Sequence, residues 1–134
     1  MLYRRGLAVF VSCVVLSWAA PLYAADEGPG DILALFDQFV SSGAAATRCA
    51  SPSDDIAVRF LSNFQWVSTH ARREISRRSP EATFEQIAEA LATRSQAVKA
   101  RTHALVKAEG CESDAVRELM RRFIVQSTWK PDTV

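Results

Sequence analysis

Apolar side chains recur every three or four residues along almost the whole chain after residue 30. This spacing places them on one side of a helix, and no segment longer than a few residues shows the alternation of a strand. The sequence therefore predicts an all-α protein. A chain of 134 residues, 49% of them hydrophobic, has room for a single core, so we expect one domain.

Helix-start and helix-stop residues divide this pattern into four helices. Asp31 is a good N-cap residue, and the first helix is expected to run to Ser42 because Gly43 follows as a stop. Ser51 is expected to cap the second helix, with Pro52 at its first position, where the missing N–H does no harm.

The second helix is expected to continue to Arg78, because a second Ser-Pro pair, like Ser51-Pro52, follows there. The triplet Ser79-Pro80-Glu81 predicts the start of a third helix, which Gly110 ends. Ser113 predicts the N-cap of a fourth helix, which stops near Pro131.

Each expected helix keeps its apolar residues on one side, so the four sides can meet in one core. The residues concerned are Ile32, Leu35, Phe36, Phe39 and Val40; Ile56, Phe60, Phe64, Val67, Ala71 and Ile75; Phe84, Ala88, Leu91, Ser95, Val98, Thr102 and Leu105; and Val116, Leu119, Met120, Phe123 and Ser127.

Two cysteines decide how the long second and third helices are related. Cys49 precedes the second helix and Cys111 follows the third, so an antiparallel hairpin brings both to its open end. A continuous rod would hold them roughly 90 Å apart at 1.5 Å per residue. We therefore expect a Cys49–Cys111 disulfide and a small antiparallel four-helix bundle built on this hairpin.

Residues 1–24 have the anatomy of a cleaved secretory signal peptide. Arg4 and Arg5 precede an apolar stretch over residues 6–18, and Ala24 lies at the expected cleavage point. Lipid attachment at Cys13 is disfavoured, because the apolar stretch continues past this residue. We expect a tail over 25–30, one helical domain over 31–130, and a tail over 131–134. No membrane span is expected in the mature chain.

The expected export predicts the compartment of the protein, whereas its net charge does not indicate a class of partner. Loss of Arg4 and Arg5 leaves 14 basic residues against 15 acidic ones, a net charge of −1. This balance excludes a polybasic nucleic-acid binder, so no nucleic-acid partner is expected. A periplasmic location, with extracellular release as the alternative, agrees with a disulfide between the two remaining cysteines.

The sequence contains no recognisable catalytic or cofactor motif. His70 and His103 are the only histidines, and the hairpin separates them by roughly 20 Å along its axis. No haem-attachment, phosphate-loop, nucleophile-elbow or zinc-protease motif occurs. We therefore expect a non-enzymatic protein without a cofactor or a bound metal.

One polar cluster allows two interpretations. His70 and Glu74 lie one turn apart on the second helix, and the hairpin sets them opposite Glu85 and Glu89. Such a set can hold a metal between helices. The alternative, interhelical salt bridges from the two glutamates, is favoured because four arginines lie nearby: Arg72, Arg73, Arg77 and Arg78.

A tryptophan surrounded by cations is the most suggestive surface feature. At 100° per residue, Arg59, Trp66, His70, Arg73 and Arg77 all fall outside the apolar side of the second helix. Tryptophan and arginine are enriched at the centres of protein interfaces. The alternative is that Trp66 packs against the first or fourth helix.

Trp129, near the end of the chain, is a second candidate anchor for a partner. The equal alternative is that Trp129 folds back and closes the end of the bundle. The sequence thus favours a periplasmic, protein-binding factor for envelope or secretion assembly, or a chaperone. The alternatives are an inhibitor or immunity protein against a periplasm-acting toxin, and a carrier of a small ligand or metal in the bundle interior.

Overall fold

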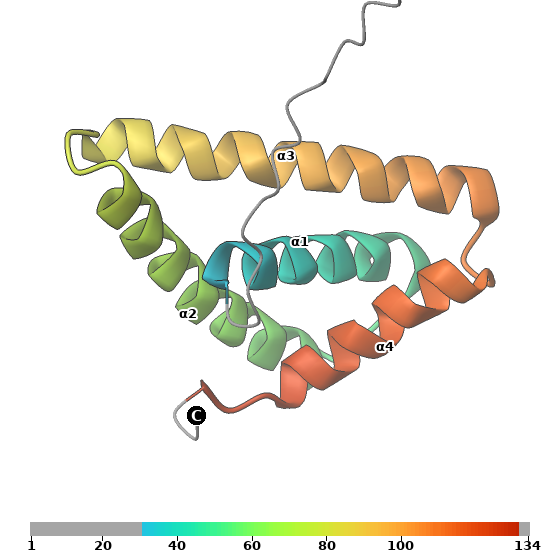
Figure 1. Ribbon diagram of the computed structural model, residues 1–134. Helices are drawn as coiled ribbons and strands as arrows, with labels where there is room; N and C mark the ends of the chain where they lie inside the picture. Colours follow the sequence, from blue (N-terminus) through green and yellow to red (C-terminus); the bar gives the residue numbers. More distant parts are fainter. Residues whose placement is uncertain (1–30, 132–134) are drawn as a thin grey trace, which may run out of the picture.

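The computed structural model describes residues 31–131, which form four α-helices (Figure 1). These are α1 (Ile32–Cys49), α2 (Asp54–Arg78), α3 (Phe84–Glu109) and α4 (Asp114–Thr128). No strand occurs in this part of the chain. The all-α class, the helical bundle and the single disulfide are confirmed. The expected signal peptide, the tail over 25–30 and residues 132–134 lie outside the described residues.

The first helix is the central element of the fold. Figure 1 shows α2, α3 and α4 as the three sides of a triangle, with α1 passing through its interior and contacting all three. Eight of the 18 residues of α1 are accordingly buried, including Phe36, Phe39 and the small residues 44–46. A helix surrounded in this way needs apolar residues on more than one side, which explains why the alanines also lie in the interior.

The helices α1 and α3 lie side by side and run in the same direction (Figure 1). In the first half of each helix, Arg94 of α3 binds Asp37 of α1. At their far ends, Cys49 and Cys111 are bonded, with their Cα atoms 5.5 Å apart. In contrast, α2 and α3 meet at residues 79–83 and diverge from there. The disulfide closes a loop 62 residues long, a constraint of about 4 kcal/mol in the chain-entropy model.

Gly43 does not end α1, and this prediction was wrong. The helix continues to Cys49 because Ala44, Ala45 and Ala46 are strong helix formers that are also buried. The glycine instead permits a close approach of α2, since a Cβ atom here would lie 3.2 Å from the ring of Phe60.

The start of α2 also differs from the prediction. The N-cap is Ser53, and the helix begins at Asp54, two residues after Pro52. Pro52 therefore belongs to the connection with α1, and Ser51 does not cap the helix. The two aspartates in the first turn remain at the positive end of the helix dipole, as expected from their charge.

The start of α3 lies later than Ser79-Pro80-Glu81, because a stronger cap follows. The Thr83 side chain accepts a hydrogen bond from the backbone N–H of Gln86, and the Gln86 side chain accepts one from the backbone N–H of Thr83. This capping box satisfies two otherwise free donors. Gly110 ends α3 with a φ of 80°, as predicted from its position.

The predicted core residues are buried or half-buried, with one exception. Phe84 is 69% exposed at the first position of α3. Ile87, one turn further on, is buried in its place. The apolar side of α3 that faces α1 thus runs through Ile87, Leu91 and Val98.

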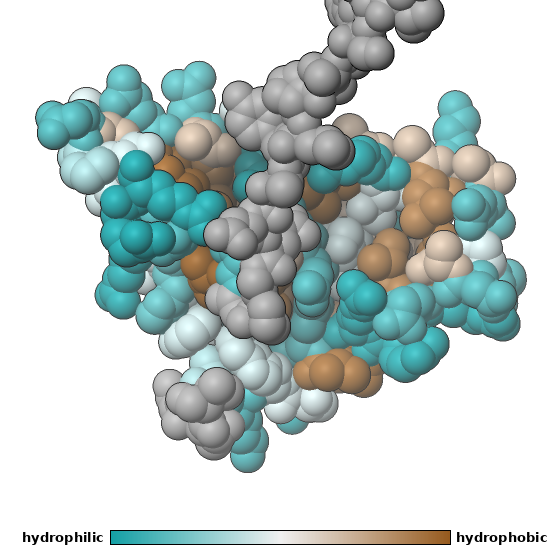
Figure 2. All heavy atoms as spheres, in the orientation of Figure 1, coloured by the Kyte–Doolittle hydropathy of each residue, from teal (hydrophilic) through white to brown (hydrophobic). Residues whose placement is uncertain are grey.

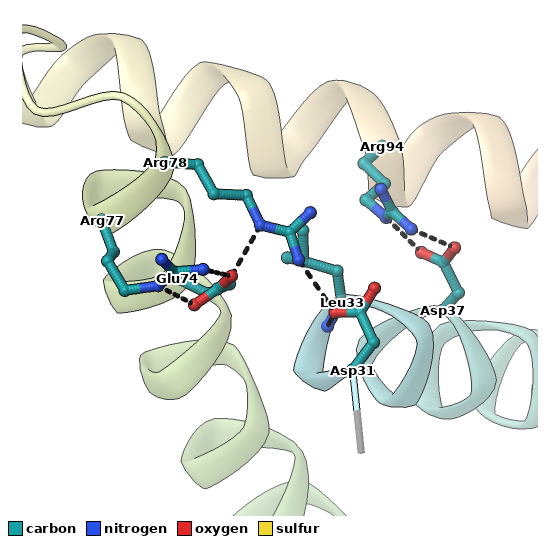
Figure 3. Close-up of polar contacts among 7 residues, drawn as sticks. All are labelled: Asp31, Leu33, Asp37, Glu74, Arg77, Arg78 and Arg94. Atoms are coloured by element: carbon teal, nitrogen blue, oxygen red, sulfur yellow. Dashed lines mark hydrogen bonds and ion pairs between the residues drawn. The ribbon is translucent and has the colours of Figure 1, made fainter. Parts of the chain in front are cut away.

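Ion pairs attach the start of α1 to its neighbours (Figure 3). Asp31 caps α1 by accepting a hydrogen bond from the backbone N–H of Leu33 and also faces Arg78 at 3.5 Å. Asp37 binds Arg94 through two hydrogen bonds of 2.7 and 2.8 Å. The central helix is therefore held by charges at one end and by the disulfide at the other. Over residues 31–131, no helix is long and apolar enough to span a membrane.

Candidate functional site

Trp66 lies at the centre of a small group of rings on the outer side of α2. Its side chain is half-buried and packs against the core. The ring of His70, one turn further along, stacks on Trp66 with 3.8 Å between the ring centroids. The ring of Trp129 packs edge-on against the ring of Trp66, with 5.3 Å between the ring centroids. The structure thus brings together three of the predicted site residues, two from α2 and one from the position directly after α4.

Trp129 is held in this position by a polar contact that the sequence interpretation missed. The Asn63 side-chain amide donates hydrogen bonds to the backbone carbonyls of Gln126, at 2.7 Å, and Trp129, at 2.8 Å. The Ser42 hydroxyl in turn donates to the side-chain oxygen of Gln126. Trp129 also lies 6.0 Å from the ring of Phe39, so it folds back on the end of the bundle.

The sequence did carry a signal for Asn63. On the helical wheel it falls about 20° from Ile56, next to the apolar side of the helix. An amide at the edge of a core needs hydrogen-bond partners, so its position predicts a polar contact. The sequence alone does not indicate which carbonyls supply it.

A hollow of about 540 Å³ lies beside the Trp66 ring. Its lining combines polar and aromatic groups: Ser62, Asn63, Gln65, Trp66, Thr69, His70, Arg73 and Pro131. We call Trp66, His70, Arg73 and Trp129, together with this hollow, the Trp66 face. Hydrogen-bonding groups at its surface, next to a flat aromatic ring, are the mixture found at protein interfaces.

The four basic residues of the predicted surface, three arginines and His70, fall into two groups. Arg59 pairs with Asp55, and Arg77 binds Glu74 through contacts of 2.6 and 2.8 Å. Neither lines the hollow. Arg73 does line it, is exposed, and makes no ion pair within residues 31–131. The His70 ring stacks on Trp66, and Arg73 is the guanidinium on this face that remains available to a partner.

The polar cluster at the end of α2 forms neither of the arrangements expected from the sequence. The carboxylate of Glu74 binds both Arg77 and Arg78 of its own helix (Figure 3). Hydrogen bonds from Arg77 and then Arg78 lower the pKa of Glu74 to about 2. The expected interhelical salt bridges of Glu85 and Glu89 are wrong, because within the described chain neither residue pairs with an arginine.

The metal interpretation of this cluster also loses its basis. Residues 31–131 contain no group of three His, Cys, Asp or Glu side chains placed to hold a metal ion. Glu74, which the metal set required, is bound by two guanidinium groups instead. Figure 2 shows the resulting hydrophilic surface over the end of α2 and its joint with α3.

A second hollow, of about 450 Å³, lies between α1, α2, α3 and α4. We call it the apolar pocket. Its walls include the rings of Phe39, Phe60, Phe64 and Phe123, and Lys99 and His103 of α3 also line it. The sequence interpretation missed this pocket because periodicity predicts which side chains turn inward and not where they leave a space.

Comparisons with protein-family models, with characterised proteins and with solved structures found no match for this chain.

Proposed function

We propose that this protein is exported to the periplasm and acts, without catalysis, by binding another protein through the Trp66 face. An assembly factor or chaperone of the cell envelope is the role that we favour. The observation that carries the proposal is Arg73, an exposed guanidinium that makes no ion pair within residues 31–131 and lies beside the Trp66–His70 stack.

The chemistry of the Trp66 face points to a partner that carries carboxylates. A guanidinium forms two parallel hydrogen bonds with a carboxylate, and this geometry is both strong and directional. The adjoining Trp66 ring is held by His70 and Trp129, so little conformational entropy is lost when a partner covers it. We infer that an acidic side chain of the partner binds Arg73 while an apolar one covers Trp66.

Two features support the exported location. The amino-terminal 24 residues have the charge and hydrophobicity of a secretory leader. The Cys49–Cys111 bond belongs to the kind of covalent link that persists in oxidising compartments.

Site-specific photo-crosslinking in the source organism's own periplasm tests the proposal. A benzophenone amino acid replaces Thr69, which is exposed in the hollow, and in the matched control replaces Gln96, which is exposed on α3. We expect a defined protein adduct from position 69 and none from position 96. The same adducts from both positions, or none from position 69, would contradict the proposal. A toxin in the adduct would assign inhibition in place of assembly.

A further inference from the structure

The apolar pocket lies on the other side of α2 from the Trp66 face. With Ile56 set to zero, the pocket residues Ala57, Phe60, Leu61 and Phe64 fall between about 40° and 140° on the helical wheel. The α2 residues of the Trp66 hollow fall between about 180° and 340°. The two hollows are therefore separate, and an inference about the pocket does not rest on the proposed function.

The pocket has an apolar wall of aromatic rings. The ring of Phe60 lies 4.4 Å from that of Phe123 and 5.4 Å from that of Phe39, measured between centroids. The helix α1 also lines the pocket with small residues, namely Ala44 and Gly43, and the Phe60 ring packs against Gly43. The volume of the pocket, about 450 Å³, lies in the range of small-molecule sites.

The ionisable side chains that line the pocket are basic. Among residues 31–131, Lys99 and His103, one turn apart on α3, are the only titratable residues that line it, and no carboxylate does. Lys99 makes no ion pair in the part of the chain that the structure describes. An ammonium group without a carboxylate, set beside an apolar pocket, complements a ligand that has an apolar body and an anionic end.

We propose that the apolar pocket binds an amphiphilic monoanion, an alkyl carboxylate of medium chain length. The alkyl chain lies among the phenylalanine rings, and the carboxylate lies at Lys99 and His103. The pocket favours a single small molecule because residues of all four helices line it and its volume suits a ligand of this size.

Titration calorimetry of the mature protein with laurate tests the proposal. Dodecyltrimethylammonium is the matched ligand, since it has a chain of the same length and the opposite charge. We expect laurate to bind with a stoichiometry of one and the cation to bind at least about tenfold more weakly. Failure to bind laurate, or equal affinity for the two ligands, would overturn the proposal.

Two pairs of variants locate the bound laurate. Ala57→Phe places a ring in the pocket and should abolish binding, whereas Val58→Phe adds the same ring at a neighbouring position that is 64% exposed and should not. Lys99→Gln should weaken binding roughly threefold to tenfold, and Lys107→Gln, exposed further along α3, less than twofold. Laurate binding that is unchanged by Ala57→Phe and Lys99→Gln would place the ligand elsewhere and refute the assignment.

Neither arm of this test uses a protein partner, so its outcome is independent of the crosslinking experiment. The comparison of the two ligands uses the unaltered mature chain. It therefore decides the charge requirement even if Ala57→Phe fails to fold.

Discussion

The two sides of α2 differ in how their aromatic residues are held. On the inner side, Phe60 packs among other phenylalanine rings and against Gly43, and its exposed fraction is only 6%. On the outer side, Trp66 is half-buried and is held by two rings, His70 along the same helix and Trp129 from the end of α4. The inner ring stabilises the fold, and the outer ring keeps part of its surface available.

This difference shows why helical position alone does not assign a role to an aromatic residue. Both rings contribute to packing, since Trp66 also touches the core. What separates them is the neighbourhood, which is apolar for Phe60 and contains Arg73 and several hydrogen-bonding side chains for Trp66. If Trp66 binds a partner, it therefore also contributes to the stability of the fold.

The largest expected effect is on the inner side. Phe60→Ala should lower the free energy of unfolding by about 3–5 kcal/mol, because it removes a buried ring and leaves a cavity beside Phe39 and Phe123. The control, Leu61→Ala, changes a neighbouring residue that is 61% exposed and should cost less than about 0.5 kcal/mol. Urea unfolding measures both, and similar losses for the two variants would contradict the described burial.

A smaller loss is expected for the outer ring. Trp66→Ala should lower the free energy of unfolding by about 2 kcal/mol, less than for a fully buried ring, because Trp66 is half-buried and still packs on Trp129. Trp66→Phe keeps an aromatic ring and should lose less than about 1 kcal/mol. If Trp66→Ala unfolds at the same urea concentration as the natural protein, the outer ring does not contribute to packing as described.

The next largest effect on the free energy of unfolding is expected at Asn63, whose amide holds Trp129 in place. Asn63→Ala should cost about 1–2 kcal/mol, because the carbonyls of Gln126 and Trp129 lose their donor. Asn63→Asp preserves the shape but cannot donate when ionised, so it should be at least as destabilising. Tryptophan fluorescence should change in both variants as Trp129 loosens. A native emission spectrum together with native stability in Asn63→Asp would refute this role.

The smallest effect concerns the ion pairs at the end of α2. Because the pKa of Glu74 is about 2 in the folded protein, below its ordinary 4.5, the folded state binds this proton less readily than the unfolded state. The stabilisation by Glu74 is thus fully present above about pH 4.5 and is lost as the pH falls toward 2.

Urea unfolding at pH 6 and pH 3 measures this dependence. The gap in stability between the natural protein and Glu74→Gln should shrink at the lower pH. Glu89→Gln, at an exposed residue that has no ion pair within the described chain, is the control and should show little change. A constant gap for Glu74→Gln would show that its pKa is not lowered by the arginines.

The sequence was sufficient for the features that depend on local pattern and covalent chemistry. The period of three to four residues predicted the helices and two thirds of the buried apolar core, and the even pair Cys49 and Cys111 predicted the disulfide. The buried apolar residues that it missed are Leu33, Ala44, Ala45, Ala46 and Ile87. Gly43 was misread as a helix stop because its role is set by the ring of Phe60 on another helix. The central position of α1 likewise follows from contacts with three helices and not from its own pattern.

The candidate site was predictable only in part, for the same reason. The helical wheel placed Trp66, His70 and Arg73 together, and the structure places them around one hollow. The wheel did not separate Arg73 from Arg59 and Arg77, which pair with acids three or four residues away. It also held no information on Trp129, whose position depends on Asn63 across a separation of 66 residues.

The affinity of the crosslinked partner for two charge-reversal variants tests the central claim most directly. Arg73→Glu and Arg72→Glu make the same change at adjacent exposed positions, and only Arg73 lines the Trp66 hollow. We expect Arg73→Glu to weaken binding at least about tenfold and Arg72→Glu to change it less than about twofold, with unfolding midpoints preserved in both. Equal affinities for the two variants would contradict the claim that the Trp66 face is the binding site.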